Sequence, residues 1–229
     1  MEIMTVEAIL FGVLILAGII AGFSAVAVFN RLPVKWLCDY NEEPCENLVL
    51  AGNIRLKAFP WKIILSALFS LAALILAPHG WQYALLILVT LWVLLIIAMA
   101  DKKYMIIPDQ FIVLLALLSF FYLPYHSSLL SPVYGALIGG GCMLLIGVAG
   151  KLIYKKEALG FGDVKLFAAI GLIAGPIGVS LLLVASSLLS CAAFSVGLIR
   201  KKLKRTDMQP LGPYVVAAYF FQELFKSTI

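Results

Sequence analysis

At residues 158–165 the chain reads ALGFGDVK, and this stretch decides how the rest of the sequence is interpreted. It places one carboxylate, Asp163, between a basic turn and an apolar run that begins at Leu166. A second carboxylate, Asp101, stands at the end of an earlier apolar run, Trp81–Ala100. Two carboxylates at the same depth of a membrane bundle suggest a pair. They can act as one only if the topology of the chain places the end of the first apolar run and the start of the second on the same side of the membrane.

The composition is that of a polytopic membrane protein. Of the 229 residues 63% are hydrophobic, and the mean hydropathy is +1.07, whereas a soluble domain is close to half apolar. Apolar stretches long enough to cross roughly 30 Å of hydrocarbon, about 20 residues each, recur along the whole length. We therefore predict an all-α membrane helical bundle in the lipid bilayer, one integral-membrane domain over residues 1–229, with a single sizeable loop at 34–58.

About eight transmembrane helices are predicted. Their ranges are Val6–Phe29, Phe59–Ala77, Trp81–Ala100, Ile106–Leu123, Pro132–Tyr154, Leu166–Ala174, Ile177–Leu198 and Pro210–Phe225. The sixth is too short to cross alone. It is expected to begin one turn earlier, near Asp163, or to join Pro176 as a broken or tilted element.

The lysines and arginines predict the orientation of these helices. If the first span exits to the cytoplasm, only Lys226 of the 17 lysines and arginines lies outside, which is a strong positive-inside bias. Asp101 and Asp163 then share the cytoplasmic side, and both histidines, His79 and His126, lie on the other side. We therefore expect no His-bound metal at the aspartates. The net charge of +5 falls in short loops and does not indicate a nucleic-acid partner.

The two aspartates could act together or serve separate structural purposes. An ionisable residue near the hydrocarbon is a functional hypothesis by default. Taken alone, Asp101 could pair with Lys102 or Lys103 at the interface, and Asp163 could cap the helix that follows it. As a facing pair in a partly desolvated site, one carboxyl keeps a proton and the other remains a base. Such a pair can activate water for attack on a peptide carbonyl.

Glycines are the second signal in the sequence. Gly160 and Gly162 would let the backbone approach an extended substrate and adopt unusual dihedral angles, or they form a simple flexible turn. Other glycines indicate close helix contacts: Gly18 and Gly22 in the first span, and Gly135, Gly139, Gly140 and Gly141 in the fifth.

Four segments resemble one family, in the order that the family has them. Residues 160–166, GFGDVKL, resemble the G-x-G-D motif, followed by V/I-K-L, of type IV prepilin peptidases, the membrane aspartic proteases of bacterial pilus, type II secretion and competence systems. Residues 101–109, DKKYMIIPD, resemble the family segment in which the other catalytic Asp precedes a hydrophobic-hydrophobic-Pro-Asp stretch. Residues 209–213, QPLGP, are similar to its Pro-Phe/Leu-Gly-Pro, and residues 31–33, RLP, match the end of its N-terminal signature.

The resemblance implies a function and a pair of catalytic residues. Carried over position by position, Asp101 and Asp163 are the catalytic pair, and Asp109 matches a position that is not catalytic, so we expect a cap or turn residue after Pro108. The implied reaction removes a short basic leader from a prepilin or pseudopilin precursor. It takes place on the cytoplasmic side of the bacterial inner membrane.

The large loop carries a cluster of acidic residues: Asp39, Glu42, Glu43 and Glu46. By charge alone this cluster could bind the cationic leader of a precursor. The alternative is a merely solvated loop face.

The sequence departs from the family in the parts associated with methyl transfer. Many members also methylate the new N-terminus with S-adenosylmethionine, and their loop carries two C-x-x-C pairs that suit a tetrahedral zinc site. Here the loop holds only Cys38 and Cys45, with no histidine nearby. Val26 stands at the signature's Asn position, and residues 59–63, FPWKI, lack the Glu that usually follows a Tyr-Pro. We predict a peptidase with lost or weakened methyltransferase activity and with neither zinc nor S-adenosylmethionine as a cofactor.

Three other functions remain open at this stage. Buried aspartates and glycine-broken helices also mark small ion-coupled transporters, although these place their acidic residues near the midplane of repeated halves. An inactive scaffold of a secretion machine would not need both aspartates. Another G-x-G-D protease, of the preflagellin or signal-peptide-peptidase type, would share the motif but not the Arg-Leu-Pro and Pro-Leu-Gly-Pro segments.

Overall fold

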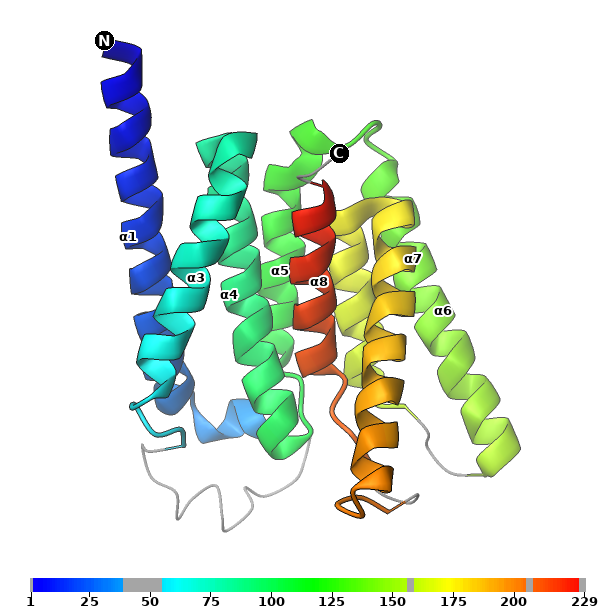
Figure 1. Ribbon diagram of the computed structural model, residues 1–229. Coiled ribbons are helices and arrows are strands. Elements are labelled where there is room, and N and C mark those ends of the chain that lie inside the picture. The colour runs from blue at the N-terminus through cyan, green and yellow to red at the C-terminus, as the bar shows by residue number, and fades with distance from the viewer. Residues whose placement is uncertain (1, 39–54, 156–158, 205–207, 227–229) are drawn as a thin grey trace. The chain divides into compact units, whose positions relative to one another are not determined.

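The computed structural model describes residues 2–38, 55–155, 159–204 and 208–226 (Figure 1). The regular structure of these residues is entirely helical, which confirms the predicted all-α class. In chain order the elements are α1 (Glu2–Arg31), η1 (Val34–Leu37), α3 (Trp61–Leu76), η2 (Ala77–His79), α4 (Trp81–Tyr104), α5 (Asp109–Tyr122), η3 (Leu123–Tyr125), α6 (Ser131–Tyr154), α7 (Phe161–Ile199) and α8 (Gly212–Lys226).

The helices have the length and surface of membrane spans. Within the described residues, five are long and apolar enough to cross a membrane: Leu10–Arg31, Trp61–His79, Trp81–Tyr104, Ser131–Ile153 and Phe161–Ile199. Large apolar side chains lie on their surfaces, with Leu152 75% and Ile199 80% exposed, as expected where lipid is the solvent. The protein is therefore a multi-pass helical membrane protein. The count of eight spans stays a prediction.

The chain forms two compact units, residues 1–96 with 223–229 and residues 97–222. The boundary falls inside α4 and close to the end of α8. Asp101 and Asp163 both belong to the second unit. That the whole chain acts as one functional domain stays a prediction.

In the first unit, α1 and α3 pack closely at two glycines of α1. A Cβ atom on Gly18 would lie 2.8 Å from the Cα atom of Ser70, and one on Gly22 would overlap the backbone of Ser66. The Ser66 hydroxyl also donates to the Ile19 carbonyl at 3.1 Å. The predicted contacts at Gly18 and Gly22 are confirmed, because small residues let membrane helices approach each other.

The end of α1 is held by a polar anchor in the same unit. The Asn30 side chain donates to the carbonyl oxygen of Leu56 at 2.9 Å and accepts from the backbone N–H groups of Arg55 at 3.1 Å and Leu56 at 2.8 Å. The Arg55 guanidinium donates to the Phe29 carbonyl at 3.2 Å. These bonds fix the segment before α3 against the end of α1.

In the second unit, α6 packs on α7 through facing glycines. A Cβ atom on Gly135 would overlap the backbone of Gly171, and one on Gly139 would overlap the carbonyl oxygen of Phe167. Gly141 has no atom within 4 Å of the position a Cβ would take. The predicted close contacts are therefore confirmed at Gly135, Gly139 and Gly140 and wrong at Gly141.

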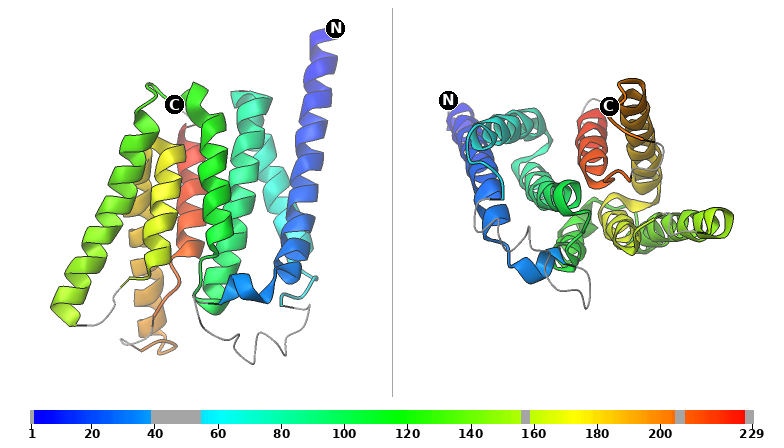
Figure 2. Two further views of the ribbon diagram at one scale, coloured as in Figure 1. Left: turned by 180° about the vertical axis from the view of Figure 1, so that it is seen from behind. Right: turned by 90° about the horizontal axis from the view of Figure 1, so that it is seen from below.

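A sharp break divides α7 into two helices. Gly175 has φ 70° and ψ −178°, a conformation essentially restricted to glycine, and Pro176 has no N–H to continue the preceding turn. The chain reverses here, so that the segment after Pro176 runs back beside the segment that begins at Phe161 (Figures 1 and 2). Both sequence expectations are confirmed, the earlier start and the break at Pro176. The reversal returns the chain to the end of this unit at which α7 began.

Candidate active site

Asp101 lies in the last turn of α4 and is buried, with 6% of the residue exposed. The backbone N–H of Gly212 donates to Asp101 Oδ2 at 2.6 Å. The backbone amide of Leu211 lies beside the same carboxylate. The predicted end of this helix at Ala100 is one turn too early, because α4 continues to Tyr104.

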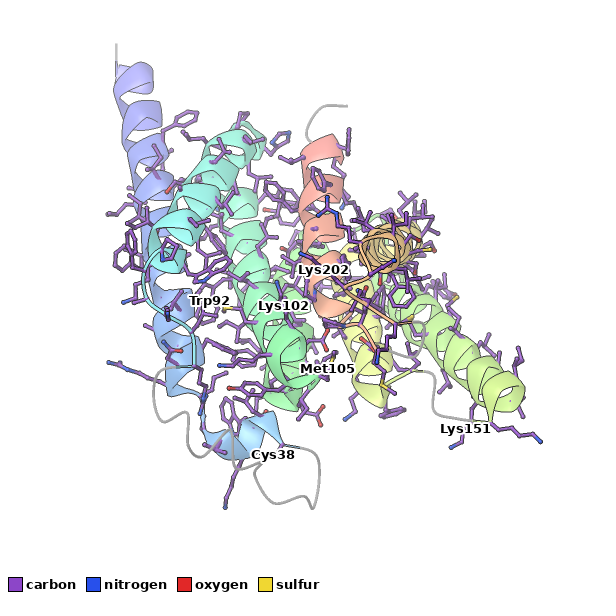
Figure 3. All side chains as sticks on the ribbon, turned by 60° about the horizontal axis from the view of Figure 1, so that its bottom comes forward. Cys38, Trp92, Lys102, Met105, Lys151 and Lys202 are labelled. Carbon is purple, nitrogen blue, oxygen red and sulfur yellow. The ribbon has the colours of Figure 1, made fainter. Side chains whose placement is uncertain are left out.

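Asp101 is not an exposed residue at the membrane interface. The partners of its carboxylate among the described residues are backbone amides, so the alternative of pairing with Lys102 or Lys103 is wrong. The helix stops because Met105 adopts φ 56° and donates its N–H to the Asp101 carbonyl at 2.8 Å. Figure 3 shows Lys102 and Met105 at this end, where the chain turns toward α5.

Asp163 lies in the first turn of α7. Gly160 precedes the helix, and no side chain caps it there, so the alternative that Asp163 is a capping residue is wrong. The Asp163 N–H donates to the Gly160 carbonyl at 3.1 Å. Its carboxyl oxygen Oδ1 is buried and has no hydrogen-bond partner in the described part of the chain. A buried polar atom in this state is costly, which marks Oδ1 as a position where a proton, a water or a substrate group would be stabilised.

The fold brings the two carboxylates together. Asp101 and Asp163 come from helices far apart in the sequence, yet the charge of Asp101 acts directly on the Asp163 carboxyl group. Both lie in the second unit, at the end where α4 stops and α7 starts. Two carboxyl groups whose charges interact in a partly buried site can divide the roles of general acid and general base in peptide hydrolysis.

The two motif glycines have different surroundings. A Cβ atom on Gly162 would lie 3.1 Å from the Cβ atom of Ile107, so this glycine lets α7 start close to the segment between α4 and α5. Gly160 has φ −70° and ψ 139°, an ordinary extended conformation. Neither glycine has a positive φ, so the prediction of unusual dihedral angles is wrong. Their part in substrate approach stays a prediction.

An ion pair that the sequence did not predict links the starts of α5 and α7. Lys165 Nζ donates to Asp109 Oδ1 at 2.9 Å and Oδ2 at 2.8 Å, and both side chains are about one third exposed. Asp109 opens α5 but does not cap it, because the boundary residue is Pro108 and no side-chain cap bond forms. The predicted cap or turn role for Asp109 is therefore replaced by a tie to the helix that carries Asp163.

His126 lies far from the aspartates, as the orientation predicted. It follows η3, and a Cβ atom on Gly175 would lie 3.5 Å from its ring. Gly175 is 12 residues beyond Asp163, about 18 Å along the helix axis at 1.5 Å per residue.

Part of the predicted site lies outside the described residues. The acidic cluster Asp39, Glu42, Glu43 and Glu46 falls there, and so does Cys45. Cys38 is described, and its thiol donates to the Val34 carbonyl at 3.2 Å. Among the described residues no group of three or more His, Cys, Asp or Glu could hold a metal ion. Leader binding by the cluster and the absence of zinc both stay predictions.

Comparison with known proteins identifies the family. The model of the type IV leader peptidase family matches residues 88–196, which include both Asp101 and Asp163. The prepilin leader peptidase/N-methyltransferase of Aeromonas salmonicida (strain A449) is 33% identical over 210 residues, which cover 84% of this chain and 70% of the relative. The chain belongs to the type IV leader peptidase family. It is therefore a peptidase, and the transporter and scaffold alternatives are set aside.

Two further relatives extend the comparison. The prepilin leader peptidase/N-methyltransferase of Aeromonas hydrophila is 36% identical over 178 residues, which cover 75% of this chain and 59% of the relative. The leader peptidase HopD of Salmonella typhimurium (strain LT2) is 32% identical over 129 residues, which cover 55% of this chain and 83% of the relative. The family thus includes relatives named for two activities and relatives named for the peptidase alone. No solved structure matches this leader peptidase significantly.

Proposed function

We propose that this leader peptidase is an aspartic endopeptidase that removes the leader from type IV prepilin-like precursors, with Asp101 and Asp163 as its catalytic pair. The proposal is supported by the placement of Asp101 and Asp163 in one compact unit, at the end where α4 stops and α7 starts, where the charge of Asp101 acts on the Asp163 carboxyl group. The names of the relatives, which refer to prepilin leaders, supply the class of substrate.

The pair would act by acid–base chemistry on a bound water. One carboxylate takes a proton from the water as its oxygen attacks the scissile carbonyl carbon, and the protonated partner donates to the carbonyl oxygen. Collapse of the tetrahedral intermediate breaks the C–N bond, and a proton passes to the leaving amine. No side-chain nucleophile and no metal takes part in this scheme.

The aspartates are proposed to face the cytoplasm from the bacterial inner membrane. Lysines lie at the helix ends on their side of the second unit, as labelled for Lys102, Lys151 and Lys202 in Figure 3. Cytoplasmic ends of membrane helices carry such an excess of Lys and Arg. The precursor's apolar helix would then lie in the bilayer while its basic leader stays on this side.

Three finer points belong to the same proposal. The acidic cluster Asp39, Glu42, Glu43 and Glu46 would bind the cationic leader. Unchanged cleavage after neutralising all four residues would refute this role of the cluster.

Methylation of the new N-terminus is lost or weak, and neither zinc nor S-adenosylmethionine is required. Efficient methyl transfer to a cleaved prepilin from a labelled donor would contradict this part.

Coexpression with candidate prepilins tests the central claim. Asp101→Asn and Asp163→Asn should each leave the precursor uncut at normal membrane levels of the enzyme. Asp207→Asn, an aspartate outside the family motifs, is the control and should cleave normally. Full leader removal by either active-site variant would overturn the aspartic mechanism. Cleavage of preflagellins but not of prepilins would show instead that the protein is a protease of the preflagellin peptidase type.

A further inference from the structure

The turn before α8 is built around Asp101. Residues 209–213 read QPLGP. The Gly212 N–H donates to Asp101 Oδ2 at 2.6 Å, and the Leu211 amide lies beside the same carboxylate. The Leu211 carbonyl in turn accepts the first bonds of α8, from the N–H groups of Tyr214 at 3.0 Å and Val215 at 3.1 Å. The start of the helix therefore fixes the direction in which these two amides point.

Glycine at position 212 lets the turn approach the carboxylate closely. A Cβ atom on it would lie 2.9 Å from Asp101 Oδ2, 3.2 Å from Asp101 Cβ and 3.2 Å from the Cα atom of Ala98. The nearest of these is shorter than an ordinary carbon–oxygen contact of about 3.3–3.6 Å. Any side chain at this position would push the turn away from the carboxylate and lengthen the 2.6 Å hydrogen bond.

The two carboxyl groups consequently have unequal surroundings. Asp101 is buried but accepts the Gly212 N–H bond at 2.6 Å, and a hydrogen bond from an N–H donor favours the ionised form of a carboxyl group against the effect of burial. Asp163 Oδ1 is buried with no partner in the described residues, and burial without a donor favours the neutral form. Residues 209–213 contain no titratable side chain, and the charge of Asp101 acts on the carboxyl group of Asp163.

We infer that the Leu211–Gly212 turn is a positioning element that holds Asp101 as the ionised base, which leaves Asp163 as the protonated acid of the pair. The inference rests on the proposed function and adds to it the division of roles between the aspartates. Asp101 would take the proton from the attacking water, and Asp163 would give its proton to the substrate carbonyl oxygen.

Isotope-edited infrared spectroscopy of the full-length protein with labelled aspartate carboxyl groups tests the division of roles without turnover. Near neutral pH, Asp163→Asn should remove a protonated carboxyl band, and Asp101→Asn should remove a carboxylate band. Loss of the carboxylate band in Asp163→Asn and of the protonated band in Asp101→Asn would overturn the inference. If both variants are inactive in that case, the aspartic mechanism itself still stands. Wild-type activity in Asp101→Asn would overturn both.

A backbone substitution tests the turn. Replacing Gly212 by glycolic acid during translation exchanges its N–H for an ester oxygen and adds no atoms that could clash. The loss of a donor to a charged acceptor should move the acidic limb of the kcat profile up by about one pH unit, roughly tenfold in proton affinity, with KM unchanged. An unmoved profile would refute the role of the turn, even if kcat fell.

Side-chain variants complete the experiment. Gly212→Ala should lose at least as much activity as the ester, because it separates both amides from the carboxylate. Gly141→Ala, with open space at its Cβ position, is the matched glycine control and should keep the wild-type profile. Wild-type activity and pH profile in Gly212→Ala would refute the inference.

Discussion

Replacing Gly139 by alanine should push α6 away from α7 and, through Phe167, displace Asp163. The added Cβ atom would overlap the Phe167 carbonyl oxygen and lie 2.8 Å from Val179 Cγ2. The two contacts are with different parts of α7, so no single side-chain rotation relieves them. Because Phe167 follows Asp163 by one helical turn, a shift of this backbone reaches the candidate active site directly.

The size of the effect follows from two opposing terms. Overpacking costs about 1–3 kcal/mol, and overlap with a backbone atom belongs at the upper end of that range. Alanine in place of glycine returns about 1 kcal/mol of helix propensity, so the net loss in free energy of unfolding is about 2 kcal/mol. For a chain of this size we expect the midpoint of thermal unfolding to fall by about 4–8 °C. A misplacement of about 1 Å at a catalytic group lowers turnover by roughly 100-fold.

Purified protein in detergent provides both readouts, thermal unfolding by circular dichroism and cleavage of a precursor. Gly141→Ala is the matched control two residues along the same helix, and its Cβ position is open. It should be active and no less stable than the wild type. Equal stability and activity of Gly139→Ala and the wild type, or equal damage in both variants, would refute the packing argument.

Three further contacts give predictions of known direction. Asp109→Asn and Lys165→Met should each cost about 0.5–1 kcal/mol, because the pair is partly exposed, and the double variant should cost no more than the worse single one; additive losses by thermal unfolding would show that the pair is not coupled. Asn30→Leu removes three hydrogen bonds at the end of α1 and should lower the free energy of unfolding by about 2–3 kcal/mol, and an unchanged unfolding midpoint would contradict this. Tyr83→Phe removes the hydroxyl that donates to Oε2 of the buried Glu223 at 2.8 Å and leaves the Lys226 bond to Oε1 in place. The change should cost about 1 kcal/mol, and in a Glu223→Leu background its cost should be smaller.

The sequence predicts the parts of this site that depend on charge and chain reversal. Counting Lys and Arg places Asp101 and Asp163 on one side. Gly175–Pro176 is a pair of residues that interrupts a helix, because glycine tolerates a positive φ and proline lacks an N–H. The start of α7 near Asp163 follows from the length that a span needs.

Contacts between side chains of different helices could not be predicted in this way. The Lys165–Asp109 pair depends on how α5 and α7 are rotated about their axes, and a single Lys and a single Asp carry no periodic signal of that rotation. The end of α4 was missed because Met105, which has no preference for a positive φ, terminates the helix. The QPLGP segment was recognised by resemblance, but its contact with Asp101 is visible only in three dimensions.

The reversal within α7 also determines which lysines share a compartment. A straight helix of 39 residues would be about 58 Å long at 1.5 Å per residue, nearly twice the hydrocarbon thickness of about 30 Å, and would separate Lys155 from Lys201 by the whole bilayer. Because the chain folds back at Gly175, an amine reagent that cannot cross membranes should modify both lysines from the same side of the membrane. With the proposed orientation, that is the side exposed in inverted vesicles and not in intact spheroplasts.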